Sequence, residues 1–343
     1  MRRFSLLFFV FFALLSLNSG AQTASAKLEK ESVTIAVGGK NLFYYLPLTI
    51  AEQRGFFKDE GLQVEVPDFA GGSKSLQALI GGSADVVSGA YEHTITMQAK
   101  DQHIREFVVQ GRAPQIVFAV STKTLPDYKA LADLKGKKIG VTAPGSSTWM
   151  MAAYLLAKAG LSIKDDVSII GVGAASTAVT AIQSGQIDAL VNLDPVTTLL
   201  EKSGSIKIVS DTRTLKDTEE VYGGLMPAAV LYSTEEFIRK NPNTTQALTN
   251  AMVRALKWLQ TATPDEVADT VPREFLLGDR QLYIAAWKNV KEAMSPDGLM
   301  DASGPGVAYK MLQTFNDDVG KKKIDLEQTY TNEFVRKANE KYR

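Results

Sequence analysis

The sequence of 343 residues contains no cysteine and only two histidines. Without cysteine the protein has no disulfide bond, no thiolate nucleophile and no cysteine ligand for a metal. The two histidines, His93 and His103, do not form the HxxH or HExxH spacing of a zinc site, which leaves little material for metal chemistry. We therefore expect neither a metal ion nor another cofactor.

An excess of either charge is also missing, because 38 Lys and Arg residues balance 38 Asp and Glu residues. The short basic cluster at residues 321–323 is more typical of a solvated loop than of a nucleic-acid surface. We expect no nucleic-acid partner and a monomeric protein.

Long apolar runs are missing after residue 26, whereas the first 26 residues contain one. Two arginines follow the first methionine, an apolar stretch covers residues 6–17, and an Ala-Ser-Ala triplet ends at residue 26. This pattern is typical of a cleavable secretory signal. A membrane anchor is the weaker alternative, because the stretch is short and no cysteine is available for lipidation. We expect a signal peptide over residues 1–26, export to the periplasm, and a mature chain with 36 basic and 38 acidic residues.

Short apolar runs rich in β-branched residues alternate with helical patterns through the first two thirds of the sequence. Such runs are typical of buried parallel strands, and their alternation with helices predicts an α/β fold. The predicted strands are residues 33–37, 64–66, 85–88, 116–120, 138–141, 167–170 and 188–191. The predicted helices between them are residues 44–54, 73–81, 146–159 and 176–184. A mainly helical region follows, with segments near 234–240, 243–261, 264–270, 279–293, 304–319 and 326–341.

Residues 66–92 and 169–195 align without a gap at an offset of 103 residues. Each copy contains a strand, a turn rich in small residues, a helix, a glycine turn, an aspartate and a second strand. The simplest account is a duplicated domain that gives two lobes of one topology, with chance similarity between generic α/β segments as the alternative. Asp85 and Asp188 occupy the same turn in the two copies, so we assign them a structural role.

Two such lobes would enclose a cleft, because open α/β sheets bind ligands at the carboxyl ends of their parallel strands. The loops at these ends are residues 38–45, 69–73 and 89–93 in the first lobe, and 142–149, 171–176 and 192–195 in the second.

Four stretches of the sequence resemble a known family. They are LPLTIAEQRGFFKDEGLQVEV (46–66), GGSKSLQALIGGSADV (71–86), LADLKGKKIGV (131–141) and AIQSGQIDAL (181–190). They resemble the nitrate/sulfonate/taurine-binding family of ABC-transporter solute-binding proteins, which also includes binding proteins for thiamine-pyrimidine precursors.

The resemblance implies a two-lobed periplasmic binding protein of type II, a clam-shell in which each lobe is a βαβ-type sheet flanked by helices. Residues 27–117 and 228–343 would form lobe one, and residues 118–227 would form an inserted lobe two. Crossover strands are expected near 115–121 and 225–233.

The implied function is capture of a small organic or inorganic anion by hinge closure and its delivery to an ABC permease with its ATPase. Sulfonates, taurine, nitrate and aromatic carboxylates are the implied ligand classes. An aminopyrimidine or thiamine precursor is an alternative ligand, and ligand sensing for a membrane receptor is an alternative role.

Backbone amides are the expected core of the binding site. The turns at residues 71–73 and 144–148 join strands to helices, where unpaired N–H groups and the positive end of a helix dipole suit an anionic head group. The hydroxyls in both turns add donors, although ordinary helix N-caps would also place them there.

Side chains in the cleft loops provide a second set of candidates. Aromatic rings there could stack on a flat ligand, and Lys40 could complement an anion. Asp194 could receive an amine, or it could cap the helix that Pro195 begins. The predicted ligand contacts are Lys40, Tyr44, Tyr45, Gly71, Gly72, Ser73, Tyr91, His93, Gln115, Ser146, Ser147, Thr148, Trp149, Asn192 and Asp194.

An enzyme is the competing class of function. Glu92 and His93 are adjacent and could transfer a proton, but we find no nucleophile for them to serve. The fungal pyrimidine-synthesising branch of the same superfamily is cytosolic, which does not suit a chain with a secretory signal. We therefore predict a binding protein, with no catalytic residues. The cleft loops are poor in arginine, the nearest being Arg112, which disfavours a small dianion and leaves room for a larger organic ligand.

Overall fold

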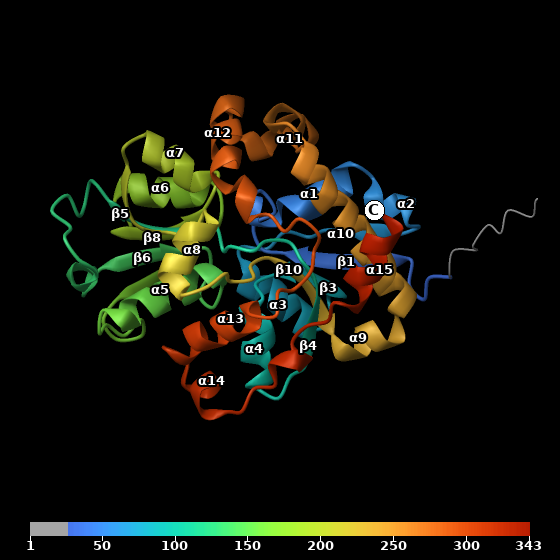
Figure 1. The fold of residues 1–343 in the computed structure, drawn as a ribbon. Coiled ribbons are helices and arrows are strands. Elements are labelled where there is room, and N and C mark those ends of the chain that lie inside the picture. Colours follow the sequence, from blue (N-terminus) through green and yellow to red (C-terminus); the bar gives the residue numbers. More distant parts are fainter. Residues whose placement is uncertain (1–26) are drawn as a thin grey trace, which may run out of the picture.

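The computed structural model describes residues 27–343, so the expected signal peptide lies outside the described residues. The chain folds into two five-stranded sheets, each flanked by helices (Figure 1). The expected two-lobed α/β architecture is confirmed, and we call the parts built on the two sheets lobe one and lobe two. The first sheet has the order β2-β1-β3-β10-β4, with β1 Ser32–Val37, β2 Gln63–Glu65, β3 Val86–Gly89, β4 Ile104–Val109 and β10 Val230–Thr234. The second has the order β7-β6-β8-β5-β9, with β5 Ile116–Ser121, β6 Lys138–Val141, β7 Ser168–Gly171, β8 Ala189–Leu193 and β9 Ile206–Asp211.

The two sheets share one topology. In each, the first three strands in the order are parallel, and the fourth runs antiparallel to both of its neighbours. The chain reaches the fourth strand of each sheet from the other lobe. β5 of lobe two directly follows β4 of lobe one, and β10 of lobe one follows the whole of lobe two, so we call β5 and β10 the exchanged strands. The chain therefore passes between the lobes twice, through residues 110–115 and residues 212–229.

The prediction that residues 116–120 form a parallel strand was wrong. β5 pairs antiparallel with β8 and with β9. The linker at residues 110–115 enters lobe two at the edge where β8 ends, so β5 must run away from that edge. An apolar run shows that a strand is buried and carries no information about its direction.

Equivalent aspartates hold equivalent strands in the two lobes. The Asp85 Oδ2 atom accepts a hydrogen bond from the Thr34 backbone N–H at 3.0 Å, and Asp188 Oδ2 accepts one from the Lys138 N–H at 2.9 Å. Each carboxylate thus ties the turn before β3 or β8 to the neighbouring strand, and the structural role expected for both is confirmed. The shared bond also supports duplication as the origin of the offset of 103 residues.

Helices flank both sheets, and their positions agree closely with the sequence pattern. The helices of the first two thirds are α1 Leu46–Gln53, α2 Phe56–Asp59, α3 Gly72–Ile80, α4 Glu92–Gln98, α5 Ser147–Lys158, α6 Ser176–Ser184, α7 Val196–Lys202 and α8 Leu215–Tyr222. The late region contributes α9 Glu235–Lys240, α10 Pro242–Thr261, α11 Pro264–Thr270, α12 Arg280–Val290, α13 Gly304–Gln313, α14 Asp317–Lys321 and α15 Glu333–Lys341. Short 3-10 helices are η1 Phe43–Tyr45, η2 Leu131–Leu134, η3 Arg273–Leu276, η4 Lys291–Ala293 and η5 Leu326–Gln328.

The late helices cover lobe one and also reach lobe two. The longest of them, α10, packs against α1 and α15 beside the first sheet (Figure 1). Two others contact helices of lobe two, α12 against α7 and α13 against α5. Apolar side chains from both sheets belong to one buried cluster, so the lobes are in contact along their facing edges. Within residues 27–343, no helix is both long and apolar enough to cross a membrane.

Candidate functional site

The loops at the facing edges of the two sheets touch each other. A Cβ atom added to Gly71 of lobe one would lie 2.7 Å from the Cβ atom of Ala143 in lobe two, closer than such atoms approach. Beside this contact, the Ser73 backbone N–H donates a hydrogen bond to Ser146 Oγ at 3.3 Å. Gly71, Ser73 and Ser146, all predicted from the two turns, therefore meet at one point between the lobes.

Hydrogen bonds between neighbouring loops at these edges also cross between the lobes. Asn41 Nδ2 donates to the Ala174 carbonyl at 3.0 Å, and the Phe43 N–H donates to the Asp194 carbonyl at 3.1 Å. His93 Nε2 lies 3.3 Å from the carbonyl oxygen of Gly145. The structure thus has its lobes closed on each other, with the loop after β1, η1, α3 and α4 of lobe one bonded to the turn before α5 and to the loops after β7 and β8 in lobe two.

The first turn of α5 presents backbone donors to the cleft. The Ser146 side chain makes no capping hydrogen bond to this helix, and its hydroxyl lies instead against Ser73. Ser147 neighbours the phenol of Tyr44, while Thr148 Oγ1 accepts from the Thr142 backbone N–H at 3.1 Å. Two of the three hydroxyls therefore face lobe one, and that of Thr148 fixes the strand-to-helix turn.

His93 is buried and bonded on both ring nitrogens. Its Nδ1 atom lies 3.0 Å from the Tyr232 hydroxyl, and burial lowers its pKa to about 4, so the ring is neutral at physiological pH. The Gly145 carbonyl only accepts hydrogen bonds, so Nε2 carries the proton and Nδ1 accepts from the Tyr232 hydroxyl. His93 therefore links Tyr232 on β10 to Gly145 in the turn before α5, and it does so as a neutral side chain.

Glu92, the residue before His93, is a buried carboxylate without a hydrogen-bond partner on Oε2. Its side chain is 3% exposed, and burial raises its pKa to about 7. The phenols of Tyr44, Tyr45, Tyr222 and Tyr232 lie within electrostatic range of it. Lone carboxyls are rarely buried because their ionised form loses its hydration, so this residue is a candidate functional group.

The first linker contributes two buried amides. Both amide atoms of Gln115 lack a partner in the part of the chain that the structure describes, and its backbone has a φ of 60°, which is unusual for a residue with a side chain. Gln110 donates from Nε2 to Ser88 Oγ at 2.8 Å, but its Oε1 atom has no partner. The linker thus holds unused hydrogen-bonding groups between the lobes.

Several predicted contacts are engaged within the protein. Lys40 Nζ pairs with Glu52 at 2.7 Å, so its charge is neutralised. The Tyr91 hydroxyl bonds Thr329 at 2.5 Å inside lobe one, and the ring of Trp149 packs edge-to-face against Phe315 with centroids 5.8 Å apart.

Asn192 and Asp194 are also engaged, in lobe two. Asn192 Nδ2 donates to the Gly173 carbonyl at 3.1 Å. The Asp194 carboxylate is fully buried, and its Oδ1 atom accepts from the Thr198 backbone N–H at 2.8 Å in the first turn of α7. Arg213 Nη1 lies 3.6 Å from the other carboxylate oxygen. The helix-capping alternative thus describes the side chain of Asp194, while its carbonyl contributes to closure.

Sequence reasoning missed Tyr222, Tyr232 and Gln110, and it considered Glu92 only as a proton-transfer group. Tyr232 lies on β10, whose place beside β3 depends on the second crossing between the lobes. The one available signal was the acidic residue inside the otherwise apolar segment GAYEHTITM, an unusual place for a carboxylate. Residues 27–343 contain no group of three or more His, Asp or Glu side chains placed to hold a metal ion.

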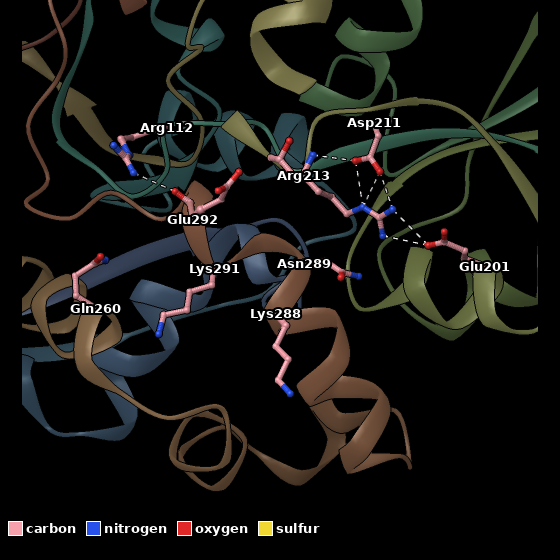
Figure 2. Close-up of a pocket in the computed structure, with 10 residues that line it drawn as sticks. Arg112, Glu201, Asp211, Arg213, Gln260, Lys288, Asn289, Lys291 and Glu292 are labelled. Carbon is pink, nitrogen blue, oxygen red and sulfur yellow. Dashed lines mark hydrogen bonds and ion pairs between the residues drawn. The ribbon is translucent and has the colours of Figure 1, made fainter. Parts of the chain in front are cut away.

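A cavity of about 800 Å³ lies away from these turns, where the two linkers meet the late helices (Figure 2). Arg213, which follows β9, pairs with Asp211 at 2.6 Å and with Glu201 at 3.3 Å (Figure 2). The Glu292 carboxylate accepts from the Leu215 N–H at 2.9 Å, and its carbonyl accepts from Arg112 at 3.1 Å. The polar groups of this cavity wall are thus bonded to one another or to the backbone beside the two linkers.

The paired topology, the exchanged strands and the closed cleft define the fold of a two-lobed periplasmic binding protein. The alkanesulfonate-binding protein SsuA of Xanthomonas axonopodis, solved with MOPS bound, has this fold, with a TM-score of 0.69, 19% identity, and coverage of 89% of this chain and 100% of that one. A solved protein of Bordetella bronchiseptica is 60% identical, with a TM-score of 0.90 over 92% of this chain and 99% of that one.

The model of the NMT1-like family matches residues 26–271, so the chain belongs to this family. It is also 26% identical to YtlA of Bacillus subtilis, named as a binding protein, over 86% of each chain. The resemblance found in the sequence is therefore confirmed at the level of family and fold.

Proposed function

We propose that the protein is a solute-binding protein that captures a small molecule between its lobes and releases it to a membrane transporter. The observation that carries this proposal is the meeting of the 71–73 and 143–146 turns across the cleft, beside buried polar groups without partners. A ligand bridging both lobes stabilises the closed form by the contacts that only the closed form makes. The binding-protein name of YtlA supports the same role.

Export to the periplasm and delivery to an ABC permease with its ATPase complete the proposal. The signal-like residues 1–26 support export, and the fold shared with periplasmic sulfonate-binding proteins supports delivery to a transporter. Residues 27–117 and 228–343 would move as lobe one, and residues 118–227 as lobe two. Monomeric action is part of this proposal, since one chain supplies both walls of the cleft.

A thermal-shift panel on residues 27–343 tests capture. The protein is first unfolded and refolded to remove co-purified ligand, then mixed with taurine, alkyl and aryl sulfonates, nitrate, aromatic carboxylates and aminopyrimidines. A ligand at one hundred times its Kd adds about 2.7 kcal/mol to the free energy of unfolding, which raises the Tm by several degrees. We expect such a rise with one class of ligand. No rise with any class would contradict the proposal, and turnover of a bound compound would favour an enzyme.

A further inference from the structure

The charge inside the cleft does not match a simple anion-binding site. Glu92 is buried at the amino end of α4, and no lysine or arginine contributes to its electrostatic environment. The groups that face it are the phenols of Tyr44 and Tyr45 from η1, Tyr222 at the end of α8, and Tyr232 on β10. The neighbouring His93 is held neutral between Tyr232 and Gly145.

The unpartnered Oε2 atom of Glu92 can accept a hydrogen bond from a donor, or pair with a cation, that a ligand brings into the cleft. This atom has no donor among the described residues, and a buried acceptor without a donor costs free energy. A small anion placed beside it would be repelled when Glu92 is ionised, and would find no arginine to offset that repulsion. The amides of the α5 turn remain available for a second, acidic or polar, end of a ligand.

We propose that Glu92 selects ligands that carry an N–H donor or a protonated nitrogen, with the body of the ligand packed among Tyr44, Tyr45 and Tyr232. This inference rests on the proposed function and specifies its ligand class. Nitrogen donors would include alkyl or aryl amines, amidines and amino-substituted heterocycles. Inorganic anions and plain sulfonates lack the group that Glu92 requires.

A second buried glutamate provides a matched control. Glu106 lies on β4 with a buried Oε2 atom that also lacks a partner, and burial raises its pKa. It is bonded through its backbone to Thr329 and Thr331, in the interior of lobe one beside Tyr91. Glu106→Gln therefore removes a buried carboxylate of the same kind without changing the inter-lobe cleft.

The experiment compares matched probes on the wild type, Glu92→Gln and Glu106→Gln. The pairs differ only by their nitrogen group, such as taurine and ethanesulfonate, 4-aminopyrimidine and pyrimidine, or benzylamine and toluene. We expect only the nitrogen-bearing member of a pair to raise the Tm of the wild type. Its Kd by calorimetry should rise about tenfold to a hundredfold in Glu92→Gln, since a hydrogen bond to a charged group is lost, and stay unchanged in Glu106→Gln.

Four outcomes would overturn the inference. Equal shifts with both members of every pair would show that the nitrogen is not recognised, and an unchanged Kd in a folded Glu92→Gln would show that this carboxylate is not the selector. Shifts with nitrate or plain sulfonates alone would overturn the inference while supporting the proposed function. No shift with any probe would overturn both.

Discussion

Adjacent buried residues at the start of α4 have pKa values displaced in opposite directions. The Glu92 carboxyl has a pKa raised by burial from 4.5 to about 7, and the His93 imidazole has one lowered by burial from 6.5 to about 4. In both cases burial disfavours the charged form. The native state therefore binds the Glu92 proton more tightly than the unfolded chain does, and the His93 proton less tightly.

This difference predicts how stability depends on pH. The contribution of protonated Glu92 to the free energy of unfolding is fully present below pH 4.5 and is lost as the pH rises to 7. The contribution of neutral His93 to the same free energy is fully present above pH 6.5 and is lost as the pH falls to 4. Glu92→Gln removes only the first effect. The variant should match the wild type near pH 4.5 and exceed its free energy of unfolding by about 3 kcal/mol at pH 8. Ligand-free denaturant unfolding at both pH values measures this, and a constant difference between them would contradict a buried, ionisable Glu92.

At the scale of the elements, glycine at the start of α3 allows the two cleft turns to meet. Gly71 has an extended backbone, so a side chain there adds no backbone strain. What a Cβ atom would meet is Ala143 of lobe two at 2.7 Å. A side chain at residue 71 would therefore change how closely the two turns approach each other, without changing the fold of either lobe.

Gly71→Ala should consequently weaken ligand binding and leave the ligand-free Tm nearly unchanged. We expect a rise in Kd of about tenfold for the probe that raised the wild-type Tm, because the closed state must relieve an overpacked contact. Adding Ala143→Gly removes the opposing methyl group and should restore most of the affinity, a coupling that a double-mutant cycle measures. Additive effects of the two substitutions would contradict a direct contact across the cleft.

The elements show what local sequence could and could not predict. Most strands and helices, and the duplication, followed from short-range periodicity, and the 71–73 and 144–148 turns followed from their place after strands. The strands β4 and β9 and the helix α4 were not predicted. The direction of β5 did not follow, since it depends on where the linker enters lobe two. Tyr91 was predicted to face the cleft because it follows a strand. Its hydroxyl partner, Thr329, lies 238 residues away in sequence, so the local pattern could not reveal that contact. The importance of Glu92 depends on its Oε2 atom having no hydrogen-bond partner among residues 27–343, which only the assembled fold reveals.

At the scale of the whole molecule, the proposed function depends on the relative motion of two lobes joined by two linkers. Few hydrogen bonds join the lobes across the cleft. On the side of the linkers, Arg213 pairs with Asp211, and the Glu292 carboxylate accepts from the Leu215 N–H. Each lobe has its own sheet and helices, so opening would break the cross-cleft contacts while leaving both sheets intact. Capture by closure requires that ligand shift the molecule between these two arrangements.

The distance between the lobes tests this account most directly. Because the sequence has no cysteine, Lys58→Cys and Lys164→Cys would supply two specific labelling sites, both exposed, one on each lobe. Pulsed electron spin resonance between nitroxides at these sites measures the distribution of distances. We predict a broad distribution at longer distances in the ligand-free protein, and a narrow one at the distance of the closed structure with the probe that raises the Tm. An identical distribution with and without that probe would contradict capture by closure.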